Sequence, residues 1–461
     1  MENNYRHKII IDPVHGDIGL SELETKIIDT PTFQRLRRLK QLGLASMVYP
    51  NADHSRFAHS IGVLHIMGCV AEIIEEKLKN KNDIQKLRIA GLLHDIGHYP
   101  YSHLMEYIDW NKYASEYLVK KGEKNLSHDT KVDNYPSHDD LAKLIVTERD
   151  DIKNVLNKYG IDPEEIARLI KGTHQDIPNL LHKSLDVDRL DYLVRDSLHT
   201  GVPYGRIDIH YILNNLSPTE KEEIVLNWKA RTAAEHLLLA RYFMFNTVYL
   251  HKTVFGLEEV FRKIILLLID RNEIYSTGSS IRQIVSKKPS NFLDFHDGYL
   301  DKFIDKYVAR KKDMLQVLCE VIKFRKPPKL IHEEIDLLEQ KASEKYILFK
   351  HCMKQDLKDI ADKCSINQEN LIWREPKDVR FEALNPLVSV SRAKDTEEEE
   401  LRQLVRIQES SGSITNLLTD PKSIIHYLSS RTLKMIRLYA VGVNKGQIEK
   451  LKGEVEKRLR L

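Results

Sequence analysis

An imidazole and a carboxylate stand side by side at His94-Asp95, directly after an apolar run that ends in Leu92 and Leu93. A charged aspartate beside a buried segment is costly to desolvate unless something pairs with it. A divalent metal ion is a suitable partner, because neutral imidazole and carboxylate are both good ligands. Taken alone, the doublet favours an ordinary His-Asp pair that closes a helix, since short motifs often match by chance.

Two further segments contain residues of the same kind. His59 lies near the start of an apolar helical stripe, and Asp188 lies in Leu185-Asp186-Val187-Asp188-Arg189. A histidine on such a stripe is more often a hydrogen-bonded core residue. Aspartates in a helix are more often exposed and paired with arginines at helical spacing, here Arg189 and Arg195. The amphipathic pattern nevertheless places Asp188 near the core boundary, so a metal site shared by the three segments is a hypothesis that the fold must test.

The elements that must position these residues are mostly helices. A hairpin is predicted over Lys8–Asp12 and Asp17–Leu20, where β-branched residues flank turn signals. Thr30-Pro31 predicts a helix start whose apolar stripe runs to Leu42, with Gly43 as its stop. The polar stretch Tyr107–Tyr135 predicts a loop-rich insertion. Further helices are expected over Arg56–Leu78, Ile84–Asp95, His138–Val146, from Asp162 onward, and over Leu185–Leu198.

The second half of the chain is more mixed. Trp228–Ile269 predicts a long, mostly helical segment, and Ser276–Ser280 predicts a loop. Lys326-Pro327-Pro328-Lys329 is a chain breaker and a candidate sub-domain boundary. Phe381–Ser391 alternates like a strand, and the acidic run Asp395–Glu400 predicts the solvated start of a helix. We therefore expect a mainly α protein with small β hairpins and a mixed α+β C-terminal region.

Composition narrows the class of protein. At 461 residues the chain exceeds one ordinary domain. A net charge of +3 with many charges of both signs argues against nucleic acid as the main partner. The four cysteines lack CxxC spacing, which predicts reduced thiols. No apolar signal region or membrane-spanning stretch is apparent, so we expect a cytoplasmic protein without a membrane partner.

Several longer motifs accompany the three candidate segments in a fixed order. In them the chain resembles the HD-domain phosphohydrolases, whose signature is H…HD…D, and within them the deoxynucleoside triphosphate (dNTP) triphosphohydrolases. The resemblance is strong from about Lys8 to Lys252. It implies an HD-domain helical core in residues 1–260, and a region of residues 261–461 that contributes to oligomerisation and allosteric nucleotide sites. The motifs are Ile11-Asp12-Pro13-Val14-His15-Gly16, Ile27-Ile28-Asp29-Thr30-Pro31-Thr32-Phe33-Gln34-Arg35-Leu36-Arg37, Lys40-Gln41-Leu42-Gly43, His94-Asp95-Ile96-Gly97-His98-Tyr99-Pro100-Tyr101-Ser102-His103 and Tyr249-Leu250-His251-Lys252.

The resemblance also implies roles for individual residues. The family's metal ligands fall on His59, His94, Asp95 and Asp188. This set suits one Mn, Fe or Zn ion or, with looser preference, Mg, which can also accompany the nucleotide. The catalytic residues fall on His98, His103, Glu106 and His138, with glutamate at 106 where the best-known relative has aspartate. The substrate contacts fall on Gln41, Leu42, Arg56, Arg189, Tyr192, Asp196, Arg241 and Tyr249. For Arg241 and Tyr249 the alternative is a snorkelling arginine and a core tyrosine.

The implied reaction is hydrolysis of a dNTP at the α-phosphorus, which gives a deoxynucleoside and inorganic triphosphate. The sequence leaves open which histidine protonates the departing 5′ oxygen. Lys8, Asp29, Arg37 and Lys252 match nucleotide contacts between subunits, which implies a GTP or dNTP activator and a homotetramer, with a dimer of dimers as one arrangement. Asp29 has the alternative of serving only a helix terminus. Another HD-domain phosphohydrolase activity (a monophosphatase or phosphodiesterase) and a catalytically weak nucleotide sensor stay open as alternatives.

Overall fold

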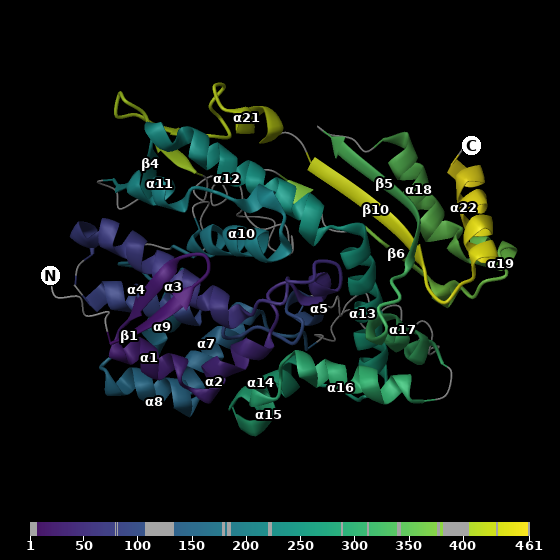
Figure 1. The fold of residues 1–461 in the computed structure, drawn as a ribbon, viewed down its shortest axis with the longest axis horizontal. Helices are drawn as coiled ribbons and strands as arrows, with labels where there is room; N and C mark the ends of the chain where they lie inside the picture. Colours follow the sequence, from purple (N-terminus) through teal and green to yellow (C-terminus); the bar gives the residue numbers. More distant parts are fainter. Residues whose placement is uncertain are drawn as a thin grey trace. The chain divides into compact units, whose positions relative to one another are not determined.

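A computed structural model describes residues 7–78, 80, 82–106, 133–177, 180–181, 186–219, 224–286, 289–310, 313–338, 343–375, 379–380, 405–429 and 432–459. The described chain is mainly helical with small sheets, which confirms the predicted class (Figure 1). It forms two compact units that interleave along the sequence. The first unit comprises Met1–Leu181, Val187–Gly201 and Arg262–Phe303, and the second comprises His182–Asp186, Val202–Phe261 and Ile304–Leu461. The functional division expected at residue 260 stays a prediction.

The first unit begins with the predicted hairpin. Strands β1 (Lys8–Asp12) and β2 (Gly16–Leu20) pair antiparallel, with Lys8 opposite Leu20. The turn between them closes on Asp12, whose Oδ1 accepts hydrogen bonds from the backbone N–H groups of Val14 and His15 at 2.9 and 3.0 Å. Such an aspartate-centred turn fixes the backbone without a longer loop. The hairpin therefore holds Asp12 and His15 in a defined geometry.

Helices predicted from periodicity carry the candidate site residues of this unit. The buried helix α3 (Arg56–Ile73) packs on α4 (Asn82–Leu93) and on α10 (Val187–Thr200). Helix α7 (His138–Glu148) begins after Ser137, whose hydroxyl accepts from the Asp140 N–H, and α9 (Pro163–Ile170) begins after the Asp162 cap. These caps satisfy N–H groups that would otherwise lack partners, which explains why sequence located both starts.

The predicted helix from Thr30 to Gly43 is wrong in length. After the Thr30 cap, α2 (Pro31–Gln34) passes into a short 3-10 turn, η1 (Arg35–Arg38), and Leu39 is extended. The cause is tertiary: the Arg35 guanidinium donates to the carbonyls of Ile96 and His98 at 2.7 and 3.0 Å. The Leu39 carbonyl accepts from the Arg56 N–H at 2.9 Å. The chain thus leaves the helix early and runs beside the start of α3.

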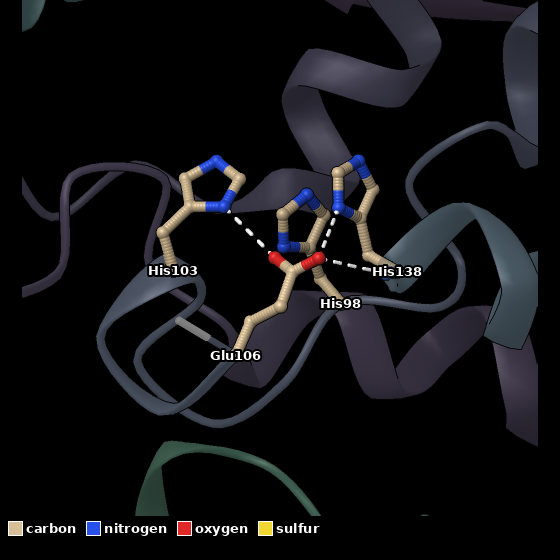
Figure 2. Close-up of side chains that lie close together, drawn as sticks. All are labelled: His98, His103, Glu106 and His138. Carbon is tan, nitrogen blue, oxygen red and sulfur yellow. Dashed lines mark hydrogen bonds and ion pairs between the residues drawn. The ribbon is translucent and has the colours of Figure 1, made fainter. Parts of the chain in front are cut away.

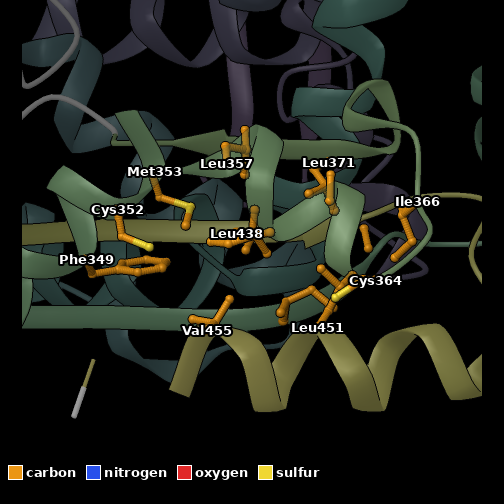
Figure 3. Close-up of a cluster of buried hydrophobic side chains, with 14 of the residues drawn as sticks. Phe349, Cys352, Met353, Leu357, Cys364, Ile366, Leu371, Leu438, Leu451 and Val455 are labelled. Carbon is orange, nitrogen blue, oxygen red and sulfur yellow. The ribbon is translucent and has the colours of Figure 1, made fainter. Parts of the chain in front are cut away.

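The second unit contains a sheet in the order β5 (Lys329–Leu338), β10 (Thr432–Ala440) and β6 (Leu371–Arg374). Helices α18 (Glu344–Gln355), α19 (Leu357–Lys363) and α22 (Lys445–Leu459) contribute a buried apolar cluster against it (Figure 3). The expected segment Trp228–Ile269 is helical but interrupted. It consists of α12 (Arg231–Met244), the π-helical turn η6 (Phe245–Tyr249) and α13 (Lys252–Asp270).

Several smaller predictions have definite outcomes. The predicted loop at Ser276–Ser280 is wrong in part, because α14 (Gly278–Ser286) begins inside it. The breaker Lys326–Lys329 lies between α17 (Met314–Lys323) and β5, both within the second unit, so it is no unit boundary. Phe381–Ser391, Asp395–Glu400 and most of Tyr107–Tyr135 lie outside the described residues. In the described part of the chain, no helix combines the length and apolarity needed to cross a bilayer.

Candidate active site

Four side chains from three helical elements converge in the first unit. His59 comes from α3, His94 and Asp95 follow α4, and Asp188 lies in the first turn of α10. The Nε2 atom of His59 lies 2.9 Å from Asp188 Oδ1 and 3.7 Å from Asp95 Oδ2. The Nε2 atom of His94 lies 3.3 Å from Asp95 Oδ1 and 3.9 Å from Asp188 Oδ1. Ligands bound at about 2.1 Å to one cation are separated by about 3.0 to 3.4 Å, close to these distances.

The donor atoms fit a divalent cation. The buried Nε2 atom of His94 makes no hydrogen bond to another described residue, and the buried Nε2 atom of His59 faces the Asp188 carboxylate at 2.9 Å. The Nδ1 atom of His94 lies 2.8 Å from the Gly91 carbonyl, which can only accept, so Nδ1 carries the proton and Nε2 keeps a lone pair. Buried polar atoms of native proteins are normally satisfied, and a metal ion would satisfy both nitrogens at once.

The charges around His59 also indicate a cation site. Burial opposes protonation of His59, but its hydrogen bonds to Asp188 and Asp191 and their charges raise its pKa to about 10. A protonated imidazole therefore supplies positive charge that these carboxylates attract, and a divalent cation could supply it instead. The set formed by His59, His94, Asp95 and Asp188, all four named from the family resemblance, is named the metal-ligand set below.

Arg56 lies against this set. Its Nη1 donates to Asp95 Oδ2 at 2.6 Å, its Nε donates to Ser102 Oγ at 2.8 Å, and its side chain is buried. Burial would raise the pKa of Asp95, but the charge of Arg56, followed by those of His94 and His98, holds it well below its usual range. The structure thus places Arg56 beside the metal-ligand set, while its contact with a phosphate stays a prediction.

Three histidines gather around one buried glutamate, and we name His98, His103, Glu106 and His138 the histidine cluster (Figure 2). The Glu106 carboxylate accepts from His103 Nδ1 at 2.9 Å and from His138 Nδ1 at 2.8 Å. The backbone N–H of His138 donates to the same carboxylate at 2.8 Å. Burial would raise the pKa of Glu106, but the charge of His138 and both imidazole hydrogen bonds hold it well below its usual range.

One histidine of the cluster differs from the other two in its protonation state. Burial, followed by the charge of Arg56, keeps the pKa of His98 well below its usual value, and burial also lowers the pKa of His103. Burial opposes protonation of His138 as well, but the charges of Glu106 and Asp139 raise its pKa to about 10. His138 is therefore the cluster's protonated imidazole at neutral pH, a distinction that sequence left open.

The histidine cluster and the metal-ligand set share a direct contact. His98 Nε2 lies 3.1 Å from Asp95 Oδ1, and the His98 ring stacks on that of His138 with centroids 4.3 Å apart. Gly97 makes this approach possible, because a Cβ there would lie 2.1 Å from the His138 carbonyl oxygen. A glycine in the segment after His94-Asp95 thus lets the start of α7 come close to the metal-ligand set.

A strained turn presents His103. Tyr101 and Ser102 both have left-handed backbones, with φ of 53° and 54°, which non-glycine residues seldom adopt. The Tyr101 N–H donates to Asp297 Oδ1 at 2.7 Å, and the Ser102 N–H donates to the Tyr99 carbonyl at 2.8 Å. These bonds stabilise a conformation that costs free energy on its own, as is common near functional sites.

The other predicted substrate residues divide between the units. Arg189, Tyr192 and Asp196 lie on α10, and the spacing of Asp188, Tyr192 and Asp196 puts those three on one helix face. Asp196 Oδ1 lies 2.8 Å from His54 Nε2, and the Gln41 N–H donates to the His54 carbonyl at 2.9 Å. Among described residues, Gln41 Oε1 and Arg189 Nη1 are buried and make no hydrogen bond. Leu42 follows Gln41, and Arg241 and Tyr249 lie in the second unit, so their roles stay predictions.

The four predicted activator contacts are exposed. Lys8 begins β1, Arg37 lies in η1, and Lys252 begins α13 in the second unit. Asp29 follows α1 (Glu22–Ile28), where its backbone N–H donates to the carbonyls of Thr25 and Ile27, and whether its carboxylate serves the next helix start or a nucleotide stays a prediction. The Arg37 guanidinium lies 3.5 Å from the centroid of the Phe57 ring. Activation by a nucleotide at these four residues stays a prediction.

Sequence comparison assigns the chain to a family. Residues 56–196 match the HD domain and residues 207–411 match the HD-associated region. The uncharacterized protein MJ1154 of Methanocaldococcus jannaschii is 34% identical over 305 residues, which are 65% of this chain and 58% of that protein. The uncharacterized protein MG461 of Mycoplasma genitalium is 30% identical over 320 residues, covering 64% of this chain and 70% of that protein.

A functionally named relative matches over a shorter region. The deoxynucleoside triphosphate triphosphohydrolase SAMHD1 of Homo sapiens is 33% identical over 226 residues, which are 42% of this chain and 34% of that protein. A crystal structure of a hypothetical protein from Aquifex aeolicus has a TM-score of 0.67 at 25% identity, covering 97% of this chain and 99% of that chain. The chain spans only 58% of MJ1154 and less of SAMHD1, so activity does not transfer from these matches alone. The chain belongs to the HD-domain family, in the group whose HD domain is followed by an HD-associated region, and is a homologue of the dNTP triphosphohydrolases.

Proposed function

We propose that this protein is a phosphohydrolase that, with a divalent metal ion, hydrolyses dNTPs to the deoxynucleoside and inorganic triphosphate. The observation that carries the proposal is the contact between Asp95 and His98, which joins the metal-ligand set to the histidine cluster. A cation site and a protonated imidazole within one buried constellation are the two parts that hydrolysis of a phosphoric ester requires. The identity of the leaving group rests on similarity to the human triphosphohydrolase.

The residues of the site divide the work. When bound, a divalent cation polarises a phosphate oxygen and acidifies water. Burial opposes protonation of His138, but the charges of Glu106 and Asp139 raise its pKa to about 10 and keep it protonated at neutral pH. In this proposal His138 donates a proton from Nε2 to the departing 5′ oxygen. Glu106 orients both His138 and His103. Arg56 and Arg189 supply positive charge for the phosphates.

Substrate selection is proposed for the α10 face and its neighbours. We assign a phosphate contact to Arg189 and sugar contacts to Tyr192 and Asp196. Gln41 and Leu42 approach the same sugar, and the buried Gln41 Oε1 still lacks a partner among described residues. Following the resemblance, we assign to Arg241 a contribution of positive charge and to Tyr249 the exclusion of ribonucleotides by close packing at the 2′ carbon.

Assembly is a second part of the proposal. A GTP or dNTP activator binds at Lys8, Asp29, Arg37 and Lys252 and favours a homotetramer, because a polyphosphate offsets the repulsion between basic groups of several chains. The hairpin that carries Lys8 also exposes Ile9 and Ile11, which are 55% and 83% exposed. Apolar side chains on a short sheet favour burial against another chain. We also infer that the protein works in the cytoplasm, where its dNTP substrates occur.

Product analysis tests the proposal. The metal-loaded protein is incubated with each dNTP and each ribonucleotide, and the products are separated by anion-exchange chromatography. We expect deoxynucleoside and triphosphate in equal amounts from dNTPs. Phosphate release from nucleoside monophosphates alone, or opening of cyclic nucleotides, would replace the proposal with another phosphohydrolase activity. Binding without any turnover would favour a nucleotide sensor. His94→Ala, purified identically, is the control for contaminating nucleases and phosphatases.

A further inference from the structure

A fully buried carboxylate lies behind the metal-ligand set. Asp191 Oδ2 lies 2.7 Å from His59 Nδ1, and Asp191 Oδ1 lies 2.6 Å from His15 Nε2. The side chain of Asp191 is 0% exposed, and those of His59 and His15 are 1% and 6% exposed. Asp191 therefore connects the side of His59 that faces away from the metal-ligand set with the turn of the N-terminal hairpin.

An arginine fixes this carboxylate from the other side. Arg195 donates from Nε to Asp191 Oδ2 and from Nη2 to Asp191 Oδ1, both at 2.8 Å. The same guanidinium donates from Nη1 to Asp12 Oδ2 at 2.8 Å and from Nη2 to Asp12 Oδ1 at 3.2 Å. The Arg195 side chain is 0% exposed. Paired bonds of this kind fix orientation as well as distance, so Arg195 holds Asp191 and Asp12 in a fixed relative position.

Space for the carboxylate comes from a glycine of α3. A Cβ at Gly62 would lie 1.9 Å from Asp191 Oδ1 and 2.5 Å from Arg195 Nη2. Gly62 follows His59 by three residues on the same helix, so the two positions share a face. Because any side chain at 62 collides with a carboxylate that is already held by four donors, the glycine is a requirement of the Asp191 position.

We propose that Asp191 is a positioning residue for the metal ligand His59, and that Asp12, His15 and Arg195 make metal affinity depend on the hairpin turn. The inference rests on the proposed metal site. For Nε2 of His59 to bind a cation, Nδ1 must carry the proton and donate it to an acceptor. Asp191 is that acceptor, and its remaining lone pairs are occupied by Arg195 and His15. The ring can therefore neither adopt the other tautomer nor rotate.

Equilibrium dialysis against Mn²⁺, with bound metal measured by elemental analysis, tests the proposal without relying on activity. Asp191→Asn keeps the shape, but its N–H₂ group must face two donors, either His59 Nδ1 with Arg195 Nε or His15 Nε2 with Arg195 Nη2. We expect the dissociation constant for Mn²⁺ to rise by about 10- to 100-fold, as for other outer partners of metal ligands. Gly62→Ala removes no polar group, but its Cβ displaces Asp191. We therefore expect the dissociation constant for Mn²⁺ to rise in this variant too.

Gly68→Ala is the matched control. It is the same substitution on the same helix, and its Cβ would lie 2.5 Å from Nη1 of Arg88, a buried arginine paired with Glu24 at 2.6 Å. Arg88 also donates to the Gly19 carbonyl of β2 at 2.9 Å, three residues along that strand from the turn that carries Asp12 and His15. We therefore expect stability to fall while Mn²⁺ affinity stays within about two-fold of wild type. Equal losses of affinity in Gly62→Ala and Gly68→Ala would show a general effect of packing and overturn the inference.

His15 provides a test that does not alter Asp191. His15→Phe removes the donor to Asp191, whereas His15→Gln keeps a nitrogen donor near the place of Nε2. We expect weakened Mn²⁺ binding in His15→Phe, by less than in Asp191→Asn, and recovery in His15→Gln. Unchanged affinity in Asp191→Asn and His15→Phe, with wild type binding Mn²⁺, overturns the positioning role but leaves the proposed function intact. A wild-type protein that binds no divalent metal overturns both.

Discussion

Replacing Glu106 with glutamine should make catalysis fail progressively as pH rises. Glu106 accepts from His138 Nδ1 and from the His138 backbone N–H, each at 2.8 Å, and its charge is the largest influence that raises the pKa of His138. Glu106→Gln keeps an oxygen for these bonds but removes the charge. Its amide N–H₂ then faces His103 Nδ1, which must become an acceptor.

The size of the effect follows from the two pKa values. In the wild type His138 has a pKa of about 10, so it remains protonated well above neutral pH. Without the carboxylate, the pKa of His138 should fall to about 6.5, the ordinary value, or below it because the ring is largely buried. The protonated fraction of the variant is then about one half near pH 6.5 and about 1% near pH 8.5. The ratio of wild-type to variant kcat should therefore grow from about 2 to about 100 over this interval.

The assay is kcat for triphosphate release from a dNTP, measured for both proteins between pH 6 and 9 at saturating metal. Because the bound cation acts on both enzymes alike, the ratio of wild-type to variant kcat reports only the effect of removing the Glu106 charge. Glu164→Gln, the same change at an exposed position in the first turn of α9, is the control and should give a ratio near 1 at every pH. A constant deficit of Glu106→Gln across this range would refute the reasoning, because it would mean that Glu106 only shapes the site.

Other predictions concern single groups. His138→Ala should lower kcat by about 100-fold or more while metal content stays at the wild-type level, and near-native kcat would exclude His138 as the proton donor. Arg35→Met should lower the free energy of unfolding by about 2 to 4 kcal/mol in urea titration, because the carbonyls of Ile96 and His98 lose a charged donor; a change below about 0.5 kcal/mol would contradict this. Arg37→Ala should weaken nucleotide activation and tetramer formation more than it changes kcat. Tetramer formation is measured by analytical ultracentrifugation with GTP. A variant that is fully active without nucleotide activation would argue against the assembly proposal.

Elements with local signals were predictable from sequence. Thr30-Pro31, Ser137-His138 and Asp162-Pro163 each place a side-chain cap before a helix, and each helix begins there. Such signals act within one turn and need no knowledge of the rest of the chain. The same logic gave the wrong end for the helix after Thr30. Its termination depends on the bonds of Arg35 to carbonyls about 60 residues away in sequence, which periodicity does not contain.

The candidate site was predictable only in part. The metal-ligand set came from the family resemblance, because a lone His94-Asp95 doublet has a commoner structural explanation. Sequence did not separate Asp191 from its neighbours, since three aspartates in one helix look alike. Asp191 follows Asp188 by three residues, so the two lie on one helix face, and this spacing was the signal in the sequence that could have identified Asp191. Only the fold shows that Gly62 leaves room for Asp191 and that His15 reaches it.

The metal-ligand set is the centre of the account, and joint measurement of metal content and turnover tests it most directly. Wild type, His94→Ala and Asp188→Ala are loaded with Mn²⁺, desalted, and analysed for bound metal, dNTP hydrolysis and folding by circular dichroism. We expect wild type to retain about one ion per chain and to release triphosphate, and both folded variants to retain almost none and to be inactive. Full metal occupancy with intact hydrolysis in both variants would contradict the assignment.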